Sequence, residues 1–379
     1  MVHLSRLVTL TALLLPFQAL AYQQPFLSNS GEELRLIQTS DDSPARWLSE
    51  SDVNQLIRMG IRFMDITENQ DLSALDVPAR FDIPRKPTNQ KLVKSYIRQL
   101  QTEPMKQALT KLTSFKTRYY KSETGAASSR WLFSQIQEII DSSAKVNVTA
   151  RFFKHSWPQS SIIARFEGTE EGNDETVILS AHQDSINQWL PWFGAAPGAD
   201  DDGSGTVTVL EAFRVLVNNG FAPQRPVEFH WYAAEEAGLL GSQAVAREYR
   251  RLGRKVVGNL HSDMTGFPGS SKPVYGIGMD NTDPELATFV KKLVEQYATI
   301  PWKEMKCGYA CSDHASWFKA GYRSAFNYES DNLESNPNIH TTRDTVETID
   351  FNHCLQFSRV VVGFAVEMSQ VKSTHSFWW

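Results

Sequence analysis

Hydrophobic residues recur along most of the chain with one of two spacings. Apolar positions three or four residues apart predict helices over residues 91–112, 132–140, 207–216, 243–252, 284–297 and 351–371. Short apolar or alternating runs predict strands over residues 177–181, 227–231, 256–260 and 323–328. Because strands and helices alternate, we expect an α/β fold, with a single globular domain whose mostly parallel mixed sheet is flanked by helices.

The first 21 residues have the pattern of a secretion signal. Arg6 precedes an apolar run from Leu7 to Leu15, and the segment ends in the small-x-small triplet Ala19-Leu20-Ala21. A membrane anchor is the alternative interpretation, but the run is far shorter than the ~20 apolar residues that cross a bilayer. We therefore expect a secreted, extracellular protein, in which Asn147 of the triplet Asn-Val-Thr can accept a glycan.

Residues 22–85 are much more acidic than the rest of the chain. They hold eleven acidic residues and six arginines, and so carry nearly all of the net charge of -5. The segment ends in Pro84-Arg85-Lys86-Pro87, a dibasic pair between two prolines, which is typical of an exposed and cleavable linker. We interpret residues 22–85 as a propeptide acting in cis and residues 86–379 as the main domain. The alternative is a small N-terminal subdomain that stays attached, and Pro87 argues against simple cleavage after the basic pair.

Composition narrows the class of protein further. The 38 Lys and Arg against 43 Asp and Glu provide no general attraction for nucleic acid or an anionic membrane. A content of 41% hydrophobic and 21% charged residues is that of a soluble globular protein. The three cysteines are too few for a disulfide scaffold, although Cys307 and Cys311 lie four residues apart and can pair.

Polar side chains follow three of the predicted strands at the point where each strand ends. These groups are His182-Gln183-Asp184, Glu235-Glu236 and His261-Ser262-Asp263, and the loop after the first strand adds the run Asp200-Asp201-Asp202. His340 lies in a loop near the C-terminus. Each group alone also fits a turn, a helix N-cap or a solvated loop. Because the carboxyl ends of parallel strands meet at one edge of a sheet, the combination indicates a single crevice.

Carboxylates that converge in one crevice repel one another and take up protons unless cations hold them. Imidazole nitrogen and carboxylate oxygen without thiolate suit zinc or a similar ion. A carboxylate that bridges two such ions makes a two-metal hydrolytic site. Of the adjacent pair Glu235 and Glu236, one can bind metal while the other takes a proton from water. The sequence therefore predicts a hydrolase with a metal centre.

These motifs resemble those of the secreted di-zinc leucine aminopeptidases of filamentous fungi and vibrios. The resemblance extends from about Thr88 to Val371 and rests on six segments: His182–Ser185, Pro197–Gly205, Ala234–Gly238, Ser262–Gly266, Cys307–Trp317 and Ile339–Thr342. It implies a monomeric metalloaminopeptidase that removes N-terminal apolar residues, Leu preferred, from peptides with a free N-terminus. The acidic segment, notably residues 60–67, also resembles the propeptides of fungal members.

The resemblance further implies how two Zn²⁺ ions per subunit would be bound. Asp201 would bridge both ions. His182 and Asp263 would complete one site, and Glu236 and His340 would complete the other.

Other residues receive roles in the same way. Glu235 would act as the general acid and base, and Tyr309 would donate to the developing oxyanion. Asp184 would fix the tautomer of the histidine ligand His182 from behind. Cys307 and Cys311 would form a disulfide at the rim of the substrate pocket.

Four positions align with those that form the apolar substrate pocket in the family: Met264, Phe326, Tyr328 and Ile339. Their character fits a first residue similar to Leu. The chain departs from the family where Asn332 and Ser335 stand, because relatives can carry aromatic residues there. The preference among Leu, Phe and Met is therefore left open.

Two enzyme classes of related fold and one non-enzymatic class compete with this interpretation. A carboxypeptidase needs a cation for the substrate carboxylate, and the nearest candidate is Arg343. A glutaminyl cyclase would keep the metals and change the substrate. An inactive binding ectodomain would have lost metal ligands or the base, whereas all of them are present here.

Overall fold

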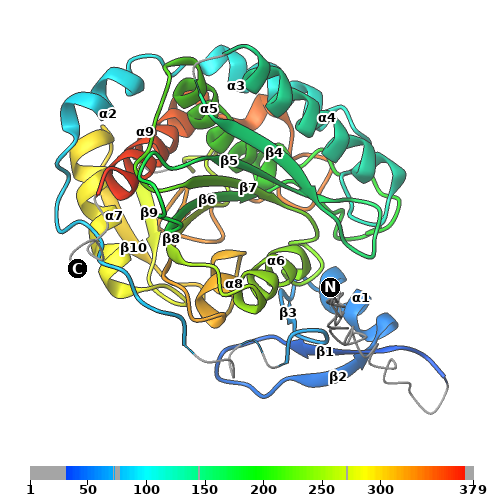
Figure 1. Cartoon of the computed structure of the whole chain (residues 1–379). Helices are drawn as coiled ribbons and strands as arrows, with labels where there is room; N and C mark the ends of the chain where they lie inside the picture. The colour runs from blue at the N-terminus through cyan, green and yellow to red at the C-terminus, as the bar shows by residue number, and fades with distance from the viewer. Residues whose placement is uncertain (1–30, 71, 73–76, 144–145, 270–271, 372–379) are drawn as a thin grey trace, which may run out of the picture.

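The computed structural model describes residues 31–371 except for residues 71, 73–76, 144–145 and 270–271. The predicted signal peptide, residues 1–21, lies outside the described residues. The described chain is built around an eight-stranded sheet with the strand order β10-β9-β11-β8-β6-β7-β5-β4 (Figure 1). None of the described helices is long and apolar enough to cross a membrane.

The four strands in the middle of the sheet are parallel. They are β11 (Ser324–Tyr328), β8 (Val256–Ser262), β6 (Thr176–His182) and β7 (Val227–Tyr232). The outer strands are β10 (Trp302–Met305), β9 (Tyr275–Gly278), β5 (Ser161–Phe166) and β4 (Val148–Phe153), and antiparallel pairs join β9 to β11 and β5 to β7. The sheet is thus mixed, with its parallel strands at the centre, as the sequence predicts.

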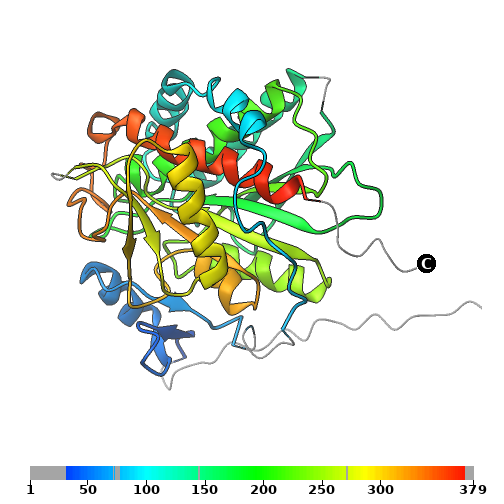
Figure 2. The ribbon, with the colours of Figure 1, turned by 90° about the vertical axis from the view of Figure 1, so that its left-hand side faces the viewer.

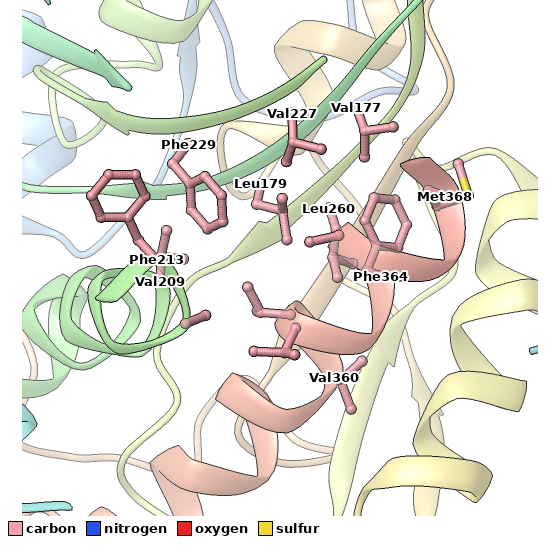
Figure 3. Close-up of a cluster of buried hydrophobic side chains, with 14 of the residues drawn as sticks. Val177, Leu179, Val209, Phe213, Val227, Phe229, Leu260, Val360, Phe364 and Met368 are labelled. Carbon is pink, nitrogen blue, oxygen red and sulfur yellow. The ribbon is translucent and has the colours of Figure 1, made fainter. Parts of the chain in front are cut away.

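Helices cover both faces of the sheet. One face carries α2 (Gln90–Ile97), α3 (Thr102–Thr113), α4 (Glu123–Asp141), α5 (Gly205–Asn218), α7 (Pro284–Tyr297) and α9 (Phe351–Ser369), and the other carries α6 (Leu240–Arg251) and α8 (His314–Lys319). Successive strand residues point to opposite faces, so Val177 and Leu179 join the larger core under α5 and α9 while Ile178 joins the smaller one under α6. Figure 3 shows Phe213 of α5 and Phe364 of α9 in the larger core.

The periodicity locates the helices and the central strands well and misses the short outer strands. The helix predicted over residues 91–112 is in fact two helices, α2 and α3, with a break at Arg98–Gln101. Pro104 explains the break, because a residue without an amide hydrogen is tolerated in the first turn of a helix and not in its interior. By contrast, α7 has the bounds that its Asp283 cap and Pro284 predict.

The first part of the acidic segment folds into a small separate sheet that packs on the main domain. Strands β1 (Leu34–Gln38), β2 (Arg46–Ser49) and β3 (Met64–Asp65) pair in the order β2-β1-β3, and α1 (Glu50–Arg58) follows β2. This N-terminal lobe, residues 31–70, lies at one side of the molecule in both views (Figures 1 and 2). Two further short segments, η1 (Ala199–Ser204) and η2 (Val346–Thr348), lie in the loops around the predicted site.

The lobe is joined to the main domain by buried contacts. Arg35 pairs with Asp65 inside the lobe at 2.7 Å and donates to the carbonyl of Ala237 in the main domain at 2.8 Å. The backbone N–H of Asp65 also donates to the carbonyl of Gly238. Gly238 has a φ of +99°, and a Cβ built there would lie 2.6 Å from the nitrogen of Asp65. Only glycine permits this approach, so residues 234–238 connect the lobe directly to the predicted site.

Candidate active site

The residues predicted for the metal centre lie at the carboxyl ends of three of the four parallel strands and in two loops beside them. Strand β6 ends at His182, β7 is followed by Glu235 and Glu236, and β8 is followed by Asp263. The loop η1 brings in Asp201, and the loop before η2 brings in His340. Two adjoining groups result, one formed by His182, Asp202 and Asp263 and the other by Asp201, Glu236 and His340, each able to hold a metal ion.

Asp201 lies between the two histidines. Its Oδ1 is 3.2 Å from Nε2 of His182, and its Oδ2 is 2.9 Å from Nε2 of His340. The same nitrogen of His182 is 3.5 Å from Oδ1 of Asp263, and that of His340 is 2.9 Å from Oε2 of Glu236. Each oxygen of Asp201 therefore faces one imidazole, and each of these imidazoles also lies beside a further carboxylate, an arrangement that suits a bridging carboxylate.

Asp202 belongs to the first group by distance, but both of its oxygens are already engaged. Oδ1 accepts hydrogen bonds from the backbone N–H groups of Gly205 and Met264, and Oδ2 accepts one from that of His182. A carboxylate that satisfies three backbone donors is held in place as a structural group. Asp202 therefore fixes the loops that carry the other residues, and Asp201 remains the residue whose oxygens point into the site.

Asp184 lies behind the site and joins two of its loops. Its Oδ1 is 3.4 Å from Nδ1 of His182. Its two oxygens also accept hydrogen bonds from the backbone N–H groups of Glu235 and Glu236, at 3.0 and 3.2 Å. One buried carboxylate thus holds the backbone of the adjacent pair of glutamates and lies beside the imidazole.

Carboxylates predominate in the site, and they shift the pKa values of the groups around them. Burial opposes ionisation of His340, yet Glu236 and Asp201 raise its pKa to about 10. Burial likewise opposes ionisation of His182, and Asp263 and Glu235 raise its pKa well above the ordinary value. Burial works against the charge of Asp201, but the two imidazoles hold its pKa well below the usual range. The acidic neighbours thus favour the charged form of both imidazoles, as they would favour a bound cation.

Several buried polar atoms of the cluster have no hydrogen-bond partner. They are Nε2 of His182, Oε1 of Glu236 and Oδ1 of Asp263. Buried polar atoms in proteins are almost always paired, so atoms left without partners indicate a missing ligand. Nitrogen and oxygen donors of this kind are those that zinc accepts, and the residues present therefore fit a zinc centre.

Glu235 lines the same pocket as the cluster without belonging to either metal-binding group. Asp201, Glu236, Asp263 and His340 line this pocket with it. Burial, reinforced by Asp263, raises the pKa of Glu235 well above its usual value. A carboxyl group whose protonated form is favoured in this way suits a role in proton transfer.

Three non-glycine residues of the site have left-handed backbone conformations. Ala234, Met264 and His340 have φ values of 58°, 57° and 57°. This conformation costs about 1–3 kcal/mol at a residue with a side chain and is concentrated at functional sites. Ala234 directly precedes Glu235, and Met264 directly follows Asp263. The strained backbone therefore lies next to side chains whose orientation in the cluster matters.

Two residues that the sequence motifs do not indicate hold the loops of the site. Arg118 is fully buried and donates to the carbonyls of Gln183, Pro197 and Gly198. Asp344 is also fully buried and accepts hydrogen bonds from the backbone N–H groups of Asp200 and Asp201. No motif marks Arg118, whereas Asp344 follows His340 by four residues, a spacing that could have drawn attention to it.

The four residues predicted for the substrate pocket lie together. Met264, Phe326 and Tyr328 are at most 1% exposed and form one apolar cluster with Cys311, against which Ile339 and Tyr309 also pack. Tyr309 and Cys311 line the pocket beside the metal-binding groups, and the four predicted residues are not among its lining. Cys307 and Cys311 are disulfide-bonded, and Asn147 is exposed just before β4.

The N-terminal lobe forms part of the wall of the pocket. Ile57 and residues 60–63 line it together with Glu235 and Tyr309. Burial lowers the pKa of Arg62, but the nearby Tyr309 and Asp201 outweigh this effect and raise it well above its ordinary value. The guanidinium group of Arg62 therefore brings a positive charge to the cluster from outside the main domain.

Comparison with known proteins places this geometry in a family. The model of peptidase family M28 matches residues 161–365. The leucine aminopeptidase 1 of Metarhizium robertsii is 46% identical over 346 residues, which cover 88% of this chain and 86% of the relative. That of Neurospora crassa is 47% identical over 337 residues, covering 86% of this chain and 83% of the relative.

The fold has a close counterpart among solved structures. The crystal structure of the LapA aminopeptidase of Legionella pneumophila superimposes with a TM-score of 0.79 at 25% identity, covering 90% of this chain and 99% of the other. Residues 86–379 make up little more than three quarters of the chain, so this match has to include residues of the acidic segment.

Proposed function

The chain belongs to peptidase family M28, and from this premise we propose that it is an extracellular leucine aminopeptidase that uses two zinc ions. That it is a zinc-dependent aminopeptidase acting on peptides follows from the family and from the relatives. Location, number of ions and residue roles belong to the proposal. The observation that carries it is the position of Asp201, whose two oxygens face His182 and His340.

We assign the metal ligands from the contacts within the cluster. His182 and Asp263 would hold one zinc ion, Glu236 and His340 the other, and Asp201 would bridge them. When bound, the ions would lower the pKa of a water molecule and polarise the carbonyl of the substrate. Asp184 would keep Nδ1 of His182 protonated, which leaves Nε2 free to bind.

Glu235 would perform the proton transfers of the reaction. It would take a proton from the attacking water and return it to the amine that leaves, in the manner of a general base that becomes a general acid. Burial raises the pKa of this carboxyl group, which makes its ionised form a stronger base toward the water molecule. Tyr309, which lines the pocket, would donate a hydrogen bond to the oxyanion that forms on the substrate carbonyl.

The preference for an apolar first residue would come from the apolar wall that Tyr309 and Cys311 present to the pocket. The predicted pocket residues would support this wall from behind, where they pack in the same cluster: Met264, Phe326, Tyr328 and Ile339. An apolar side chain in such a cluster gains about 25 cal/mol for each Å² that it buries. Only a peptide with a free amino group would be cleaved, because the acidic residues of the site attract an ammonium group and an acylated terminus offers none.

We also propose that residues 22–85 are an inhibitory propeptide. Arg62 lines the pocket and carries the same charge as the ammonium group of a substrate. The lobe would therefore exclude substrate until it is removed after secretion. The predicted signal peptide, residues 1–21, and the exposed Asn147, a glycosylation triplet, fit an extracellular monomer.

The proposed function is tested with three substrates and a chelator. Processed protein should cleave Leu-p-nitroanilide, leave its N-acetylated form intact and leave a peptide with C-terminal Leu at its carboxyl end intact. A chelator should abolish the activity, and added zinc should restore it. Cleavage of the acetylated substrate, or release of the C-terminal Leu, would contradict an aminopeptidase.

A further inference from the structure

A loop beside the pocket exposes four large apolar side chains. Residues 188–193, here called the aromatic loop, follow β6 and have the sequence Gln-Trp-Leu-Pro-Trp-Phe. The exposed fractions are 62% for Trp189, 46% for Leu190, 45% for Trp192 and 57% for Phe193. Such a group of apolar side chains in contact with water usually marks a surface that binds something.

The loop is built as a fixed feature. Oδ1 of the buried Asn187 accepts hydrogen bonds from the backbone N–H groups of Trp189 and Leu190, and its Nδ2 donates to the carbonyl of Ala195. The N–H of Gly194 closes the loop by donating to the carbonyl of Leu190 at 2.7 Å. The apolar side chains are therefore held outward by a braced backbone, which suits a binding surface because little entropy is lost on contact.

The loop is continuous with the pocket. Ile186 lines the pocket, and the backbone N–H of Gln188 donates to the carbonyl of His340 at 2.9 Å. Ile186 also belongs to an apolar cluster with Tyr119 and Tyr120, on which Ile57 of the N-terminal lobe packs. The apolar cluster at the pocket thus continues along the chain into the aromatic loop. Its members Ile186, Tyr119 and Tyr120 are at most 6% exposed, and the lobe places the apolar side chain of Ile57 on them.

This surface is distinct from the cluster that receives the first residue. The pocket is lined by Tyr309 and Cys311 from the cluster containing Phe326, and by Ile186 and Ile57 from the cluster containing Tyr119. If the first side chain of the substrate contacts the cluster containing Phe326, the remainder of the peptide can contact the cluster containing Tyr119. An extended peptide advances about 3.3 Å per residue, so its second to fourth residues span about 10 Å beyond the first.

We propose that the surface from Ile186 to the aromatic loop binds the second to fourth residues of the substrate and favours peptides whose side chains there are apolar. The inference rests on the proposed aminopeptidase function and deepens it. Residues 182–205 contain no Lys or Arg, so the loop lacks the basic flanks with which a protein binds an anionic membrane.

The test compares substrates that differ only after the first residue. They are Leu-Phe-Phe, Leu-Gly-Gly and Leu-p-nitroanilide, which are assayed with the processed zinc enzyme and with the double variant Trp189→Ser/Trp192→Ser. We expect KM for Leu-Phe-Phe to rise about 10-fold with kcat unchanged, because two side chains that contribute only to binding are lost. Values for Leu-Gly-Gly and Leu-p-nitroanilide should change less than twofold.

The control is Leu252→Ser, an equally exposed apolar residue at 47%, which follows α6 and precedes the start of β8, at the end of the strand away from the site. This variant should leave the kinetic constants for all three substrates unchanged.

Three outcomes of the double variant would contradict the inference. An equal loss of activity on all three substrates would show that the loop merely supports the site, and an unchanged KM for Leu-Phe-Phe would exclude peptide binding. If the double variant instead lost vesicle binding or dimerisation while keeping its KM values, the surface would have another partner and the inference would be wrong. Wild-type enzyme inactive on Leu-p-nitroanilide would contradict the proposed function itself.

Discussion

Oδ2 of Asp344 accepts a hydrogen bond from the backbone N–H of Asp201 at 3.1 Å, while its Oδ1 accepts one from that of Asp200 at 2.8 Å. The carboxylate at the centre of the site is thus held from behind by another carboxylate that lies outside the proposed ligand set. Two backbone amides directed at one carboxylate leave the Asp201 side chain little freedom.

Replacing Asp344 by Asn should weaken zinc binding without removing a ligand. An amide has one acceptor atom, and its NH₂ group would face one of the two backbone N–H groups. We expect zinc affinity to fall about 10–100-fold, the usual effect of losing a group that orients a ligand. Competition with a fluorescent chelator measures it. The control is Asp350→Asn. Oδ1 of Asp350 accepts hydrogen bonds from the backbone N–H groups of both Asn352 and His353, and the oxygen of an amide can accept the same two bonds. Equal affinities of both variants would contradict this role.

Glu235→Gln should remove activity and leave the metals in place. The amide keeps the shape of the side chain but cannot take a proton, so kcat should fall about 10²–10⁴-fold. Elemental analysis should find the same zinc content as in the wild type, because Glu235 belongs to neither metal-binding group. Loss of zinc along with activity would instead make Glu235 a ligand.

Arg62→Ala should activate the uncleaved chain. Without the guanidinium group the lobe no longer places a positive charge at the cluster, and a substrate ammonium group can compete for the entrance. We expect the activity of unprocessed protein on Leu-p-nitroanilide to rise about 10-fold or more, the scale of losing one paired charge at an interface.

The matched control is Arg58→Ala, which removes an exposed arginine of the same lobe that does not line the pocket. This variant should stay as inactive as the unprocessed wild type. If unprocessed wild-type protein were as active as the processed form, residues 22–85 would not inhibit.

Zinc binding should release protons and strengthen as the pH rises. In the metal-free cluster the pKa of His340 is raised to about 10 and that of Glu236 to about 7. Both groups must lose their protons to bind a metal. Protons therefore compete with zinc less strongly as the pH rises. Calorimetry in buffers of different ionisation enthalpy, between about pH 7 and about pH 9, should show net proton release. Heats independent of the buffer would mean that these groups do not bind the ions.

Much of the site could be predicted because its residues follow buried apolar runs. His182, Glu235, Glu236 and Asp263 each come at or just after the end of a strand whose residues are buried on both faces. Strands of that kind give a strong signal, and the topology of a parallel sheet then brings their ends together.

The outer strands and the supports of the site were less accessible to sequence reasoning. In β4 and β5 an arginine interrupts the apolar run, and β9 and β10 have only four residues each. The role of Arg118 depends on three carbonyls that only the folded chain brings together, and that of Arg62 depends on how the lobe docks. Local patterns contain no trace of such contacts, because they are made between residues far apart in the sequence.

The central claim is that Asp201 holds two zinc ions in one site, and counting the ions tests it most directly. Metal-free processed protein is titrated with zinc while bound metal and cleavage of Leu-p-nitroanilide are measured, for the wild type and for Asp201→Ala. We predict two ions per chain with full activity for the wild type, and loss of both tightly bound ions in the variant while its circular dichroism spectrum is unchanged. Full activity with a single ion per chain, or an Asp201→Ala protein that retains both ions, would contradict the account.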